Sequence, residues 1–266
     1  MADLFVTGRW FHYTLLPEHE KKIYMHIYTG LKDRNTDFTF PLEKVNGVYP
    51  PEDRIMDILG HVLWDNPAMY YVDGTNIRAY YQTNPSGKVR ITYTEYYTPE
   101  QSARIEQILR MRVDEILDML YDQAEGHPQI YNLYRYMIAN MEYMYDVSRE
   151  NTLSNLEART IVGPLLTRLG VCAGVAKMFK LILDQLGIGC FYIRGDANGN
   201  KGWGKHGWNV VYLDGEFFHV DVTFDISYYK QTKRVQCKYF LRGDRFMWED
   251  HRWDRSKFPP MKDYFE

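Results

Sequence analysis

Hydrophobic and polar positions in the first part of the chain follow two different periods, and this predicts both helices and strands. Apolar residues recur every three or four positions over residues 17–32 and 51–64, as in amphipathic helices. Runs rich in Tyr, Ile, Val and Thr over residues 36–42, 77–83 and 88–96 predict strands. An Asn-Pro-Ser-Gly sequence between the last two runs is typical of a hairpin turn. The first part of the chain is therefore predicted to be a small α/β unit.

From Thr98 the pattern becomes helical over a long stretch. Thr98 and Gln101 fit a capping box, and Pro99 fits the first helical position. The helical period continues to about residue 125, and a second helix is expected to end near residue 145. A Glu-Gly-His-Pro turn separates the two helices, so we expect a domain boundary there. The predicted domains are an N-terminal α/β unit, residues 1–126, and a second domain, residues 127–266.

The second half predicts one helix followed by antiparallel strands. Residues 172–186 are apolar on one face and end before Gly187, which favours a helix stop. Strand patterns follow over residues 188–194, 207–213 and 216–224. Asp214–Gly215 lies between the last two strands and is a strong signal for a two-residue hairpin. The fold class predicted for the chain is α+β, with a helix packed on an antiparallel sheet.

Composition and charge narrow the range of partners. The chain has 266 residues, of which 45% are hydrophobic and 25% charged, as is ordinary for a soluble globular protein. The net charge is -3 and the basic residues form no run, so nucleic acid is not an expected partner. No apolar stretch reaches the ~18 residues that cross a bilayer, and the N-terminus lacks a secretory signal pattern. We expect no membrane partner and a cytoplasmic location, or secretion if a signal was trimmed.

The cysteines and tyrosines change this picture in different ways. Cys172, Cys190 and Cys237 are too few for a disulfide framework and lack the spacing of a zinc site. Cys190 and Cys237 are expected to be packing residues, and no metal or cofactor is expected. Tyrosine is abundant, with 23 residues. Its ordinary role is on half-buried faces of helices and strands, and the alternative is a Tyr-lined groove for a peptide or glycan.

Cys172 occupies a position that favours a reactive thiol. It follows an extended Gly-Val pair and begins the predicted helix in the sequence GVCAGVAKMF. Free amide N–H groups and the positive end of the helix dipole stabilise a thiolate there. The backbone N–H of Cys172 also points to where an oxyanion would develop during acyl transfer. The small residues Ala173, Gly174 and Ala176 would let another segment of the chain approach closely.

A base and an orienting carboxylate are predicted on the hairpin that follows. His206 stands at the entrance of one strand and Asp221 lies on the next. A two-residue turn at Asp214–Gly215 places residue 208 opposite Asp221, so His206 is a diagonal neighbour of Asp221 on the same face. From there Asp221 can fix the tautomer of His206 and stabilise its imidazolium. Cys172, His206 and Asp221 together predict a triad for nucleophilic catalysis.

The segments GVCAG, HGWN and FFHVDVTFD, in this order, resemble the transglutaminase-like superfamily of papain-type cysteine enzymes, in particular its bacterial cytokinesis-protein-type members. The resemblance covers residues 145–225 and implies a papain-like core with Cys172, His206 and Asp221 at the catalytic positions. The sequence departs from the family pattern at Gly207, where Ala is usual. The resemblance implies an enzyme for cysteine-dependent acyl transfer on a protein or peptide substrate. The acceptor is left open, with water giving a peptidase or amidase and an amine giving a transglutaminase.

The triad has competing interpretations in the sequence. A non-catalytic scaffold or peptide-binding module could retain the same fold. His219 shares a predicted face with Asp221 and competes with His206 as the base. A metal site made by these three residues is a weaker alternative, because neither an HxxxH nor an HxH spacing is present.

The segments around the triad carry four further expectations. Trp208 and Asn209 are expected to pack and hydrogen-bond behind His206. Asp225 and His251 are expected in solvated loops rather than as supporting groups of the triad. The glycine-rich residues 197–205 are expected to form a mobile flap, with Trp203 able to cover a substrate.

Overall fold

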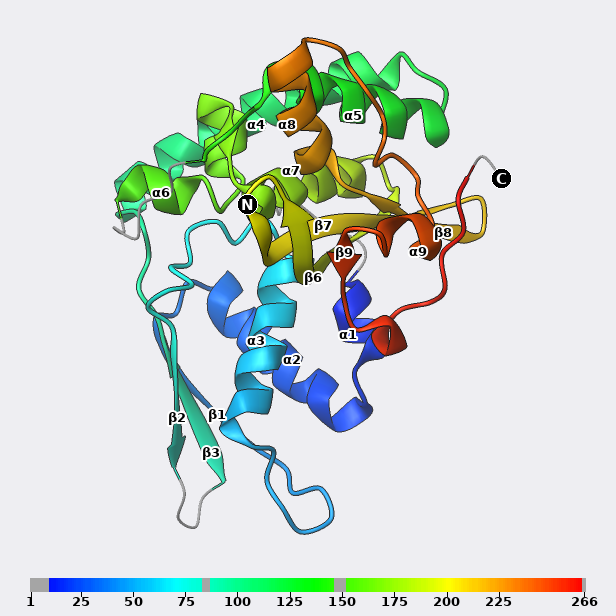
Figure 1. Cartoon of the computed structure of the whole chain (residues 1–266). Helices are drawn as coiled ribbons and strands as arrows, with labels where there is room; N and C mark the ends of the chain where they lie inside the picture. Colours follow the sequence, from blue (N-terminus) through cyan, green and yellow to red (C-terminus); the bar gives the residue numbers. More distant parts are fainter. Residues whose placement is uncertain (1–9, 83–86, 146–151, 265–266) are drawn as a thin grey trace. The chain divides into compact units, whose positions relative to one another are not determined.

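The structure is a computed structural model that describes residues 10–82, 87–145 and 152–264. By compactness the chain divides into an N-terminal unit, Trp10–Ala103, and a C-terminal unit that begins at Arg104. The sequence instead predicts a boundary at residue 126, which lies in the turn between α4 (Pro99–Tyr121) and α5 (His127–Asn140) (Figure 1). From Arg104 onward α4 belongs to the same unit as α5, and the buried Gln129 side chain donates to the Leu120 carbonyl across the turn between them, at 3.4 Å.

The N-terminal unit contains a three-stranded antiparallel sheet in the order β1-β3-β2. Its helices are α1 (Phe11–Leu15), α2 (Glu18–Lys32) and α3 (Glu52–Asp65), and its strands are β1 (Asp37–Pro41), β2 (Arg78–Gln82) and β3 (Lys88–Thr92). These elements confirm the helices and strands that the hydrophobic pattern predicts. The predicted turn between β2 and β3 falls largely on residues 83–86, which lie outside the described residues.

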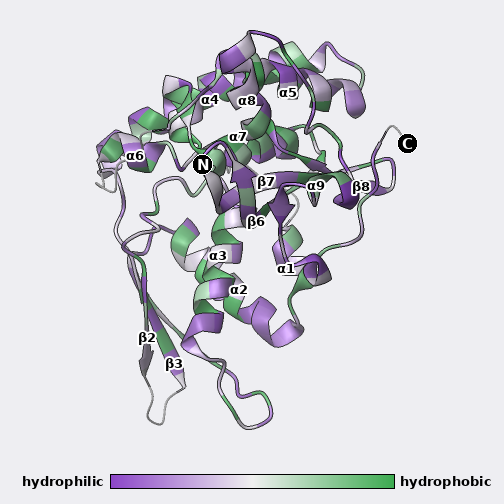
Figure 2. Ribbon diagram, viewed as in Figure 1, coloured by the Kyte–Doolittle hydropathy of each residue, from purple (hydrophilic) through white to green (hydrophobic). Residues whose placement is uncertain are grey.

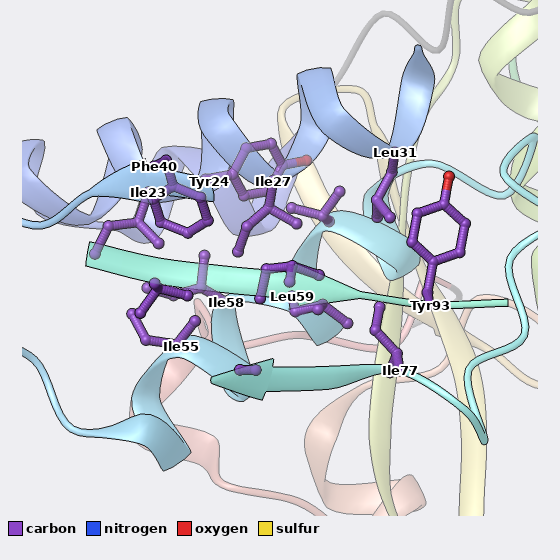
Figure 3. Close-up of a cluster of buried hydrophobic side chains, with 14 of the residues drawn as sticks. Ile23, Tyr24, Ile27, Leu31, Phe40, Ile55, Ile58, Leu59, Ile77 and Tyr93 are labelled. Carbon is purple, nitrogen blue, oxygen red and sulfur yellow. The ribbon is translucent and has the colours of Figure 1, made fainter. Parts of the chain in front are cut away.

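One hydrophobic cluster holds the N-terminal unit together. Ile27 and Leu31 of α2 meet Ile55 and Ile58 of α3 and the inner face of the sheet, and all four side chains are fully buried (Figure 3). Each such side chain contributes on the order of 1.5–3 kcal/mol by leaving water. Hydrophobic and hydrophilic positions alternate along both helices, as burial of only one face requires (Figure 2).

The C-terminal unit has a four-stranded antiparallel sheet in the order β8-β7-β6-β9. The strands are β6 (Gly189–Gly199), β7 (Gly202–Leu213), β8 (Glu216–Val220) and β9 (His251–Arg252). α7 (Cys172–Gln185) packs against β6 and β7, and Figure 2 shows it largely in the hydrophobic colour. This arrangement confirms the predicted α+β fold, with the cysteine helix on an antiparallel sheet.

Shorter elements complete the C-terminal unit. The strands β4 (Glu142–Tyr143) and β5 (Leu169–Gly170) pair in parallel. The remaining elements are α6 (Leu153–Glu157), a π-helical turn (Gly163–Thr167), α8 (Val222–Thr232), α9 (Asp244–Met247) and a 3₁₀ turn (Arg255–Lys257). Among the described helices, none is both long enough and apolar enough to cross a membrane.

The hairpin between β7 and β8 has the predicted register. Asp214 and Gly215 both have positive φ angles, 52° and 88°, as a tight two-residue turn requires. Leu213 then pairs with Glu216, and Asn209 pairs with Val220. The predicted strand at 216–224 is too long, however, because β8 ends at Val220 and α8 follows.

One further expectation about local structure is wrong. The helix predicted to continue to about residue 145 ends at Asn140, because Met141 is extended and leads directly into β4. Residues 197–205, predicted as a mobile flap beside the site, form the tip of a β-hairpin, since β6 and β7 stay paired as far as Gly199 and Gly202. Strand pairing satisfies the backbone of this glycine-rich segment, which a loose loop would leave to solvent.

Candidate active site

Cys172 is the first residue of α7, as the sequence predicts. Val171 before it is extended, and the Val171 N–H donates to the Ala158 carbonyl at 3.0 Å. A β-carbon on Gly174 would lie 2.2 Å from that same carbonyl oxygen, so only glycine fits. The predicted close approach at the small residues is therefore made by the chain itself, and it fixes the start of α7.

His206 and Asp221 meet directly, although they are 15 residues apart. The Nε2 atom of His206 lies 2.7 Å from Oδ2 of Asp221, and both residues are buried. Asp221 follows the last residue of β8 and caps α8, because its Oδ1 accepts hydrogen bonds from the Thr223 N–H at 2.9 Å and the Phe224 N–H at 3.3 Å. The cap holds one carboxylate oxygen and leaves the other for His206.

The thiol of Cys172 completes this row of side chains. The His206 ring and the backbone N–H of Gly207 lie close enough to the thiol to lower its pKa. Because Nε2 of His206 faces Asp221, Nδ1 is the ring nitrogen that remains for the thiol. Burial alone would raise the pKa of Cys172, but the hydrogen bond and charge of His206 outweigh it and the pKa is lowered.

The imidazole of His206 is correspondingly basic. Burial alone would lower its pKa, but the Asp221 carboxylate and the hydrogen bond to Cys172 raise it to about 10. Lowering the thiol pKa while raising the imidazole pKa favours a thiolate–imidazolium pair.

The other two thiols lack such an environment. Burial raises the pKa of Cys190, which lies inside β6, and it also raises the pKa of the partly exposed Cys237. The expectation that both are packing residues agrees with these positions. Cys172 is thus the one thiol of the three whose pKa is lowered.

Comparison with known proteins agrees with this geometry. Residues 118–222, which include all three side chains, match the model of the transglutaminase-like superfamily. The match covers less than half of the chain, and this segment is similar to a transglutaminase-like domain. A search of curated proteins found no match.

Solved structures show partial likenesses at low sequence identity. A candidate cysteine protease from Cytophaga hutchinsonii is 16% identical over 55% of this chain and 61% of its own, with a TM-score of 0.34. A structure described as a TGase is 10% identical over 74% of this chain and 52% of its own, with a TM-score of 0.39. A candidate protease from Parabacteroides distasonis is 11% identical over 56% of this chain and 36% of its own, with a TM-score of 0.32. The chain thus spans less than two thirds of each of these proteins.

The departure from the family pattern at Gly207 has a local explanation. A β-carbon at Gly207 would lie 1.9 Å from the hydroxyl of Tyr192 on the neighbouring strand. The tyrosine therefore occupies the space that an alanine methyl group would need. Behind the triad, Trp208 and Asn209 pack as predicted, and the Asn209 side chain donates to the Ala176 carbonyl of α7 at 3.0 Å.

Tyr143 lies beside the start of α7. It pairs with Gly170 in the β4–β5 ladder, two residues before Cys172, and the Cys172 backbone N–H is close enough to its hydroxyl to act on the pKa of Tyr143. Burial and the nearby negative charges of Cys172 and Asp221 raise the pKa of Tyr143, so its hydroxyl keeps its proton. Sequence reasoning missed this residue, and its only signal was the tyrosine cluster at residues 131–145.

His219 is not placed to act as the base. It is fully buried, and its Nδ1 accepts a hydrogen bond from Trp208 Nε1 at 3.0 Å. Its Nε2 lies 3.1 Å from Asp244 Oδ1, and burial lowers its pKa. Both ring nitrogens are therefore engaged away from Cys172, which excludes the competing interpretation and the metal site built on His219.

His251 and Asp225 are both wrongly predicted as solvated loop residues. His251 is fully buried, and its Nε2 lies 3.0 Å from the same Asp221 oxygen that His206 contacts. Asp225 is a buried residue of α8, and its Oδ2 accepts from the Tyr134 hydroxyl at 2.6 Å and from the Tyr239 N–H at 3.2 Å. Burial raises the pKa of Asp225 to about 6. Asp225 lies four residues after Asp221 in the same segment, whereas the 30 residues between Asp221 and His251 give no signal that links them.

The cluster of His206, Asp221 and His251 presents ligand atoms within 4.8 Å of one another, which makes a metal site worth testing. Ligand atoms around a tetrahedral metal at roughly 2.1 Å would lie about 3.4 Å apart. The carboxylate oxygen instead lies 2.7 Å and 3.0 Å from the two ring nitrogens, which are hydrogen-bond distances. The donor set therefore fits a proton-sharing network better than a metal centre.

An open groove of about 480 Å³ runs beside His206 and Tyr143. Tyr145, Tyr228 and Tyr239 also line it, so the predicted Tyr-lined groove has a counterpart next to the triad. Trp203 is absent from the described residues that line the groove, and its ring lies under the guanidinium of Arg252 at 4.8 Å. The tip of the β6–β7 hairpin forms one wall of the groove. Trp203 does not cover the groove as predicted.

Proposed function

We propose that the chain catalyses cysteine-dependent acyl transfer on a peptide or amide bond. Cys172 is the nucleophile, His206 is the base and then the acid, and Asp221 orients His206 and stabilises its charge. The observation that carries the proposal is the direct contact of His206 with Asp221 at 2.7 Å, next to a Cys172 thiol whose pKa His206 lowers. Such an arrangement supplies the nucleophile, base and orienting group of covalent catalysis.

The reaction has two balanced halves. The Cys172 thiolate attacks the carbonyl carbon, and the C–N bond breaks as His206 gives its proton to the leaving amine. This step leaves a thioester on Cys172. A water molecule or a second amine then attacks the thioester, His206 takes the proton of the attacking group, and the thiolate is released. Water gives hydrolysis, a second amine gives transamidation, and the triad serves both.

The tetrahedral intermediates need donors for their oxyanion. We propose the Cys172 backbone N–H as one donor and the Tyr143 hydroxyl as the other, because the two lie close enough for the N–H to act on the pKa of Tyr143. In the reaction the oxyanion would accept one hydrogen bond from the Cys172 N–H and a second from the tyrosine O–H. A neutral tyrosine can serve in this way because it keeps its proton.

The substrate proposed for the groove is a protein or peptide segment. Tyrosine rings along the groove offer flat apolar surfaces with polar edges. Asn198, Asn200, Gln231 and Gln236 line the same groove, and amide side chains match the donors and acceptors of a peptide backbone. No cofactor is required by these steps.

A peptide library offered to the wild-type protein, with and without an added primary amine, tests the proposal. We expect new amine termini from hydrolysis, or amine-labelled products from transamidation, and loss of both in Cys172→Ala. Cys237→Ala is the matched control, because this partly exposed thiol has a raised pKa and should leave turnover unchanged. Product formation by Cys172→Ala at the wild-type rate would overturn the proposal. Peptide binding without any product in the wild type would favour the scaffold interpretation.

A further inference from the structure

Asp221 has a second imidazole partner besides His206. His251, at the start of β9, places its Nε2 3.0 Å from Asp221 Oδ2, and its Nδ1 lies 2.6 Å from Asp250 Oδ1. The ring of His251 is fully buried, and Asp221 is 1% exposed. The Asp250 carboxylate also accepts a hydrogen bond from the Tyr239 hydroxyl. The row of hydrogen bonds thus continues past the triad to a second histidine and a second carboxylate.

The hydrogen-bond partners of the two ring nitrogens of His251 determine its protonation state and therefore its charge. Each of its ring nitrogens faces a carboxylate, and an ionised carboxylate can only accept a hydrogen bond. Both nitrogens must therefore carry a proton, which makes the ring an imidazolium. The pKa directions agree: burial alone would lower the pKa of His251, but Asp221 and Asp250 raise it. Burial alone would raise the pKa values of the two carboxylates, which their histidine partners hold low.

Other charged groups around His251 do not change this assignment. His206, on β7, lies with its ring centroid 5.5 Å away and lowers the pKa of His251 by repulsion between the two cations. The Lys238 ammonium acts on Asp250 and helps to keep that carboxylate ionised. The rings of Trp208, Phe224 and Tyr239 enclose the remaining faces of the imidazole.

We propose that His251 is a positioning residue of the triad, an imidazolium held between Asp221 and Asp250 that fixes the Asp221 carboxylate toward His206 and shares its negative charge. This inference rests on the proposed function of Cys172, His206 and Asp221. A carboxylate with one imidazolium partner would hold the His206 proton more tightly than a carboxylate shared by two. His251 therefore makes His206 a better proton donor to the leaving amine.

Because His251 is charged, its removal should shift the midpoints of the pH profile in a definite direction. Loss of a hydrogen bond alone would not fix that direction. Removing a buried cation near the thiolate–imidazolium pair makes Cys172 harder to deprotonate and His206 harder to deprotonate as well. Both midpoints of the pH profile should therefore move upward. Charges at this range, in a protein interior with an effective dielectric constant of about 20, give shifts of roughly one pH unit.

The test measures the rate of iodoacetamide alkylation at Cys172 against pH, resolved by peptide mass spectrometry. His251→Gln keeps a hydrogen-bond donor for Asp221 and removes the charge, so its acid midpoint should lie roughly one unit above the wild-type midpoint. Asp250→Asn keeps the imidazole but removes the carboxylate that holds it charged, so its midpoint should move in the same direction by less. His219→Gln is the matched control, since His219 is equally buried and also faces a carboxylate, and its midpoint should not move.

Each outcome is decisive for one of the two proposals. A folded His251→Gln protein with the wild-type profile, or with a downward shift, overturns the role of His251 and leaves the triad intact. If His251→Gln does not fold, the profile of Asp250→Asn decides in the same way. A wild-type Cys172 midpoint at or above the ordinary thiol value of about 8.5 overturns the proposed function itself.

Discussion

Asp221 uses one carboxylate oxygen to cap α8 and the other to meet His206, whose Nε2 lies 2.7 Å away. The two tasks support each other. Hydrogen bonds from the Thr223 and Phe224 N–H groups fix the plane of the carboxylate, so Oδ2 is aimed without help from solvent. The position at a helix N-terminus also favours the ionised form of Asp221.

Asp221→Asn is expected to keep the fold and lose turnover. Asparagine is as good an N-cap as aspartate, so α8 should still form. It cannot stabilise the imidazolium of His206 and can present the wrong partner to its ring, so kcat should fall on the order of 10⁴-fold. Circular dichroism and peptide turnover measure the two effects. Asp196→Asn on the same sheet is the control, because Asp196 pairs with exposed Lys205 and should leave kcat unchanged.

The pairing register of β7 and β8 could be predicted from the sequence, but the residue at which β8 ends could not. Asp214–Gly215 fixes the pairing of β7 and β8, and that pairing alone places Asp221 near His206. The residues Val220–Phe224 alternate as a strand would, and they hide the start of α8 at Val222. The Asp221 cap that ends the strand depends on a side chain whose partners the alternation does not reveal.

Tyr143→Phe separates oxyanion stabilisation from thiol reactivity. We expect a loss of roughly 10²-fold in kcat for peptide substrates, because one of two oxyanion donors is removed. Alkylation by iodoacetamide forms no oxyanion, so its rate at Cys172 should stay within about twofold, although the hydroxyl contacts the Cys172 N–H.

Tyr121→Phe is the control for Tyr143→Phe, because Tyr121, at the end of α4, is not among the described residues that line the groove and its exposed fraction is 59%. Turnover of this control should match the wild type. A Tyr143→Phe protein with wild-type kcat, or with equal losses in turnover and alkylation, would rule out Tyr143 as an oxyanion donor.

Asp225 gives a stability prediction with a definite sign. Burial raises its pKa to about 6, so between pH 4 and pH 6 the folded protein holds a proton that the unfolded chain has lost. The free energy of unfolding should therefore fall as the pH rises through this window, by roughly 3 kcal/mol from this group. Asp225→Asn removes this pH-dependent loss of stability, because asparagine does not ionise.

Denaturant titrations of Asp225→Asn and the wild type at pH 4 and pH 7 measure this effect. The stability of the variant relative to the wild type should rise by roughly 3 kcal/mol between the two pH values. Asp57→Asn, at a side chain that is 68% exposed, should show a constant difference. A constant difference for Asp225→Asn as well would show that Asp225 is ionised at low pH in the folded protein.

The positions of His251 and Tyr143 next to the site could not be predicted from the sequence, for a physical reason. His251 lies 30 residues after Asp221, and a short strand that pairs with β6 brings it back. No local period encodes such a long-range return. Tyr143 reaches Cys172 through the two-residue ladder of β4 and β5, which is too short to leave a pattern. The triad itself could be predicted because a helix start and one hairpin contain all three residues.

The most direct test of the account is the alkylation of the three cysteines at pH 6 in the folded protein, resolved by peptide. The account predicts that Cys172 reacts at least 100-fold faster than Cys190 or Cys237, since a thiol with an ordinary pKa of about 8.5 is less than about 1% ionised there. His206→Gln should remove most of that advantage. Equal rates at the three thiols, or a Cys172 rate that does not depend on His206, would contradict the assignment of Cys172 as the nucleophile.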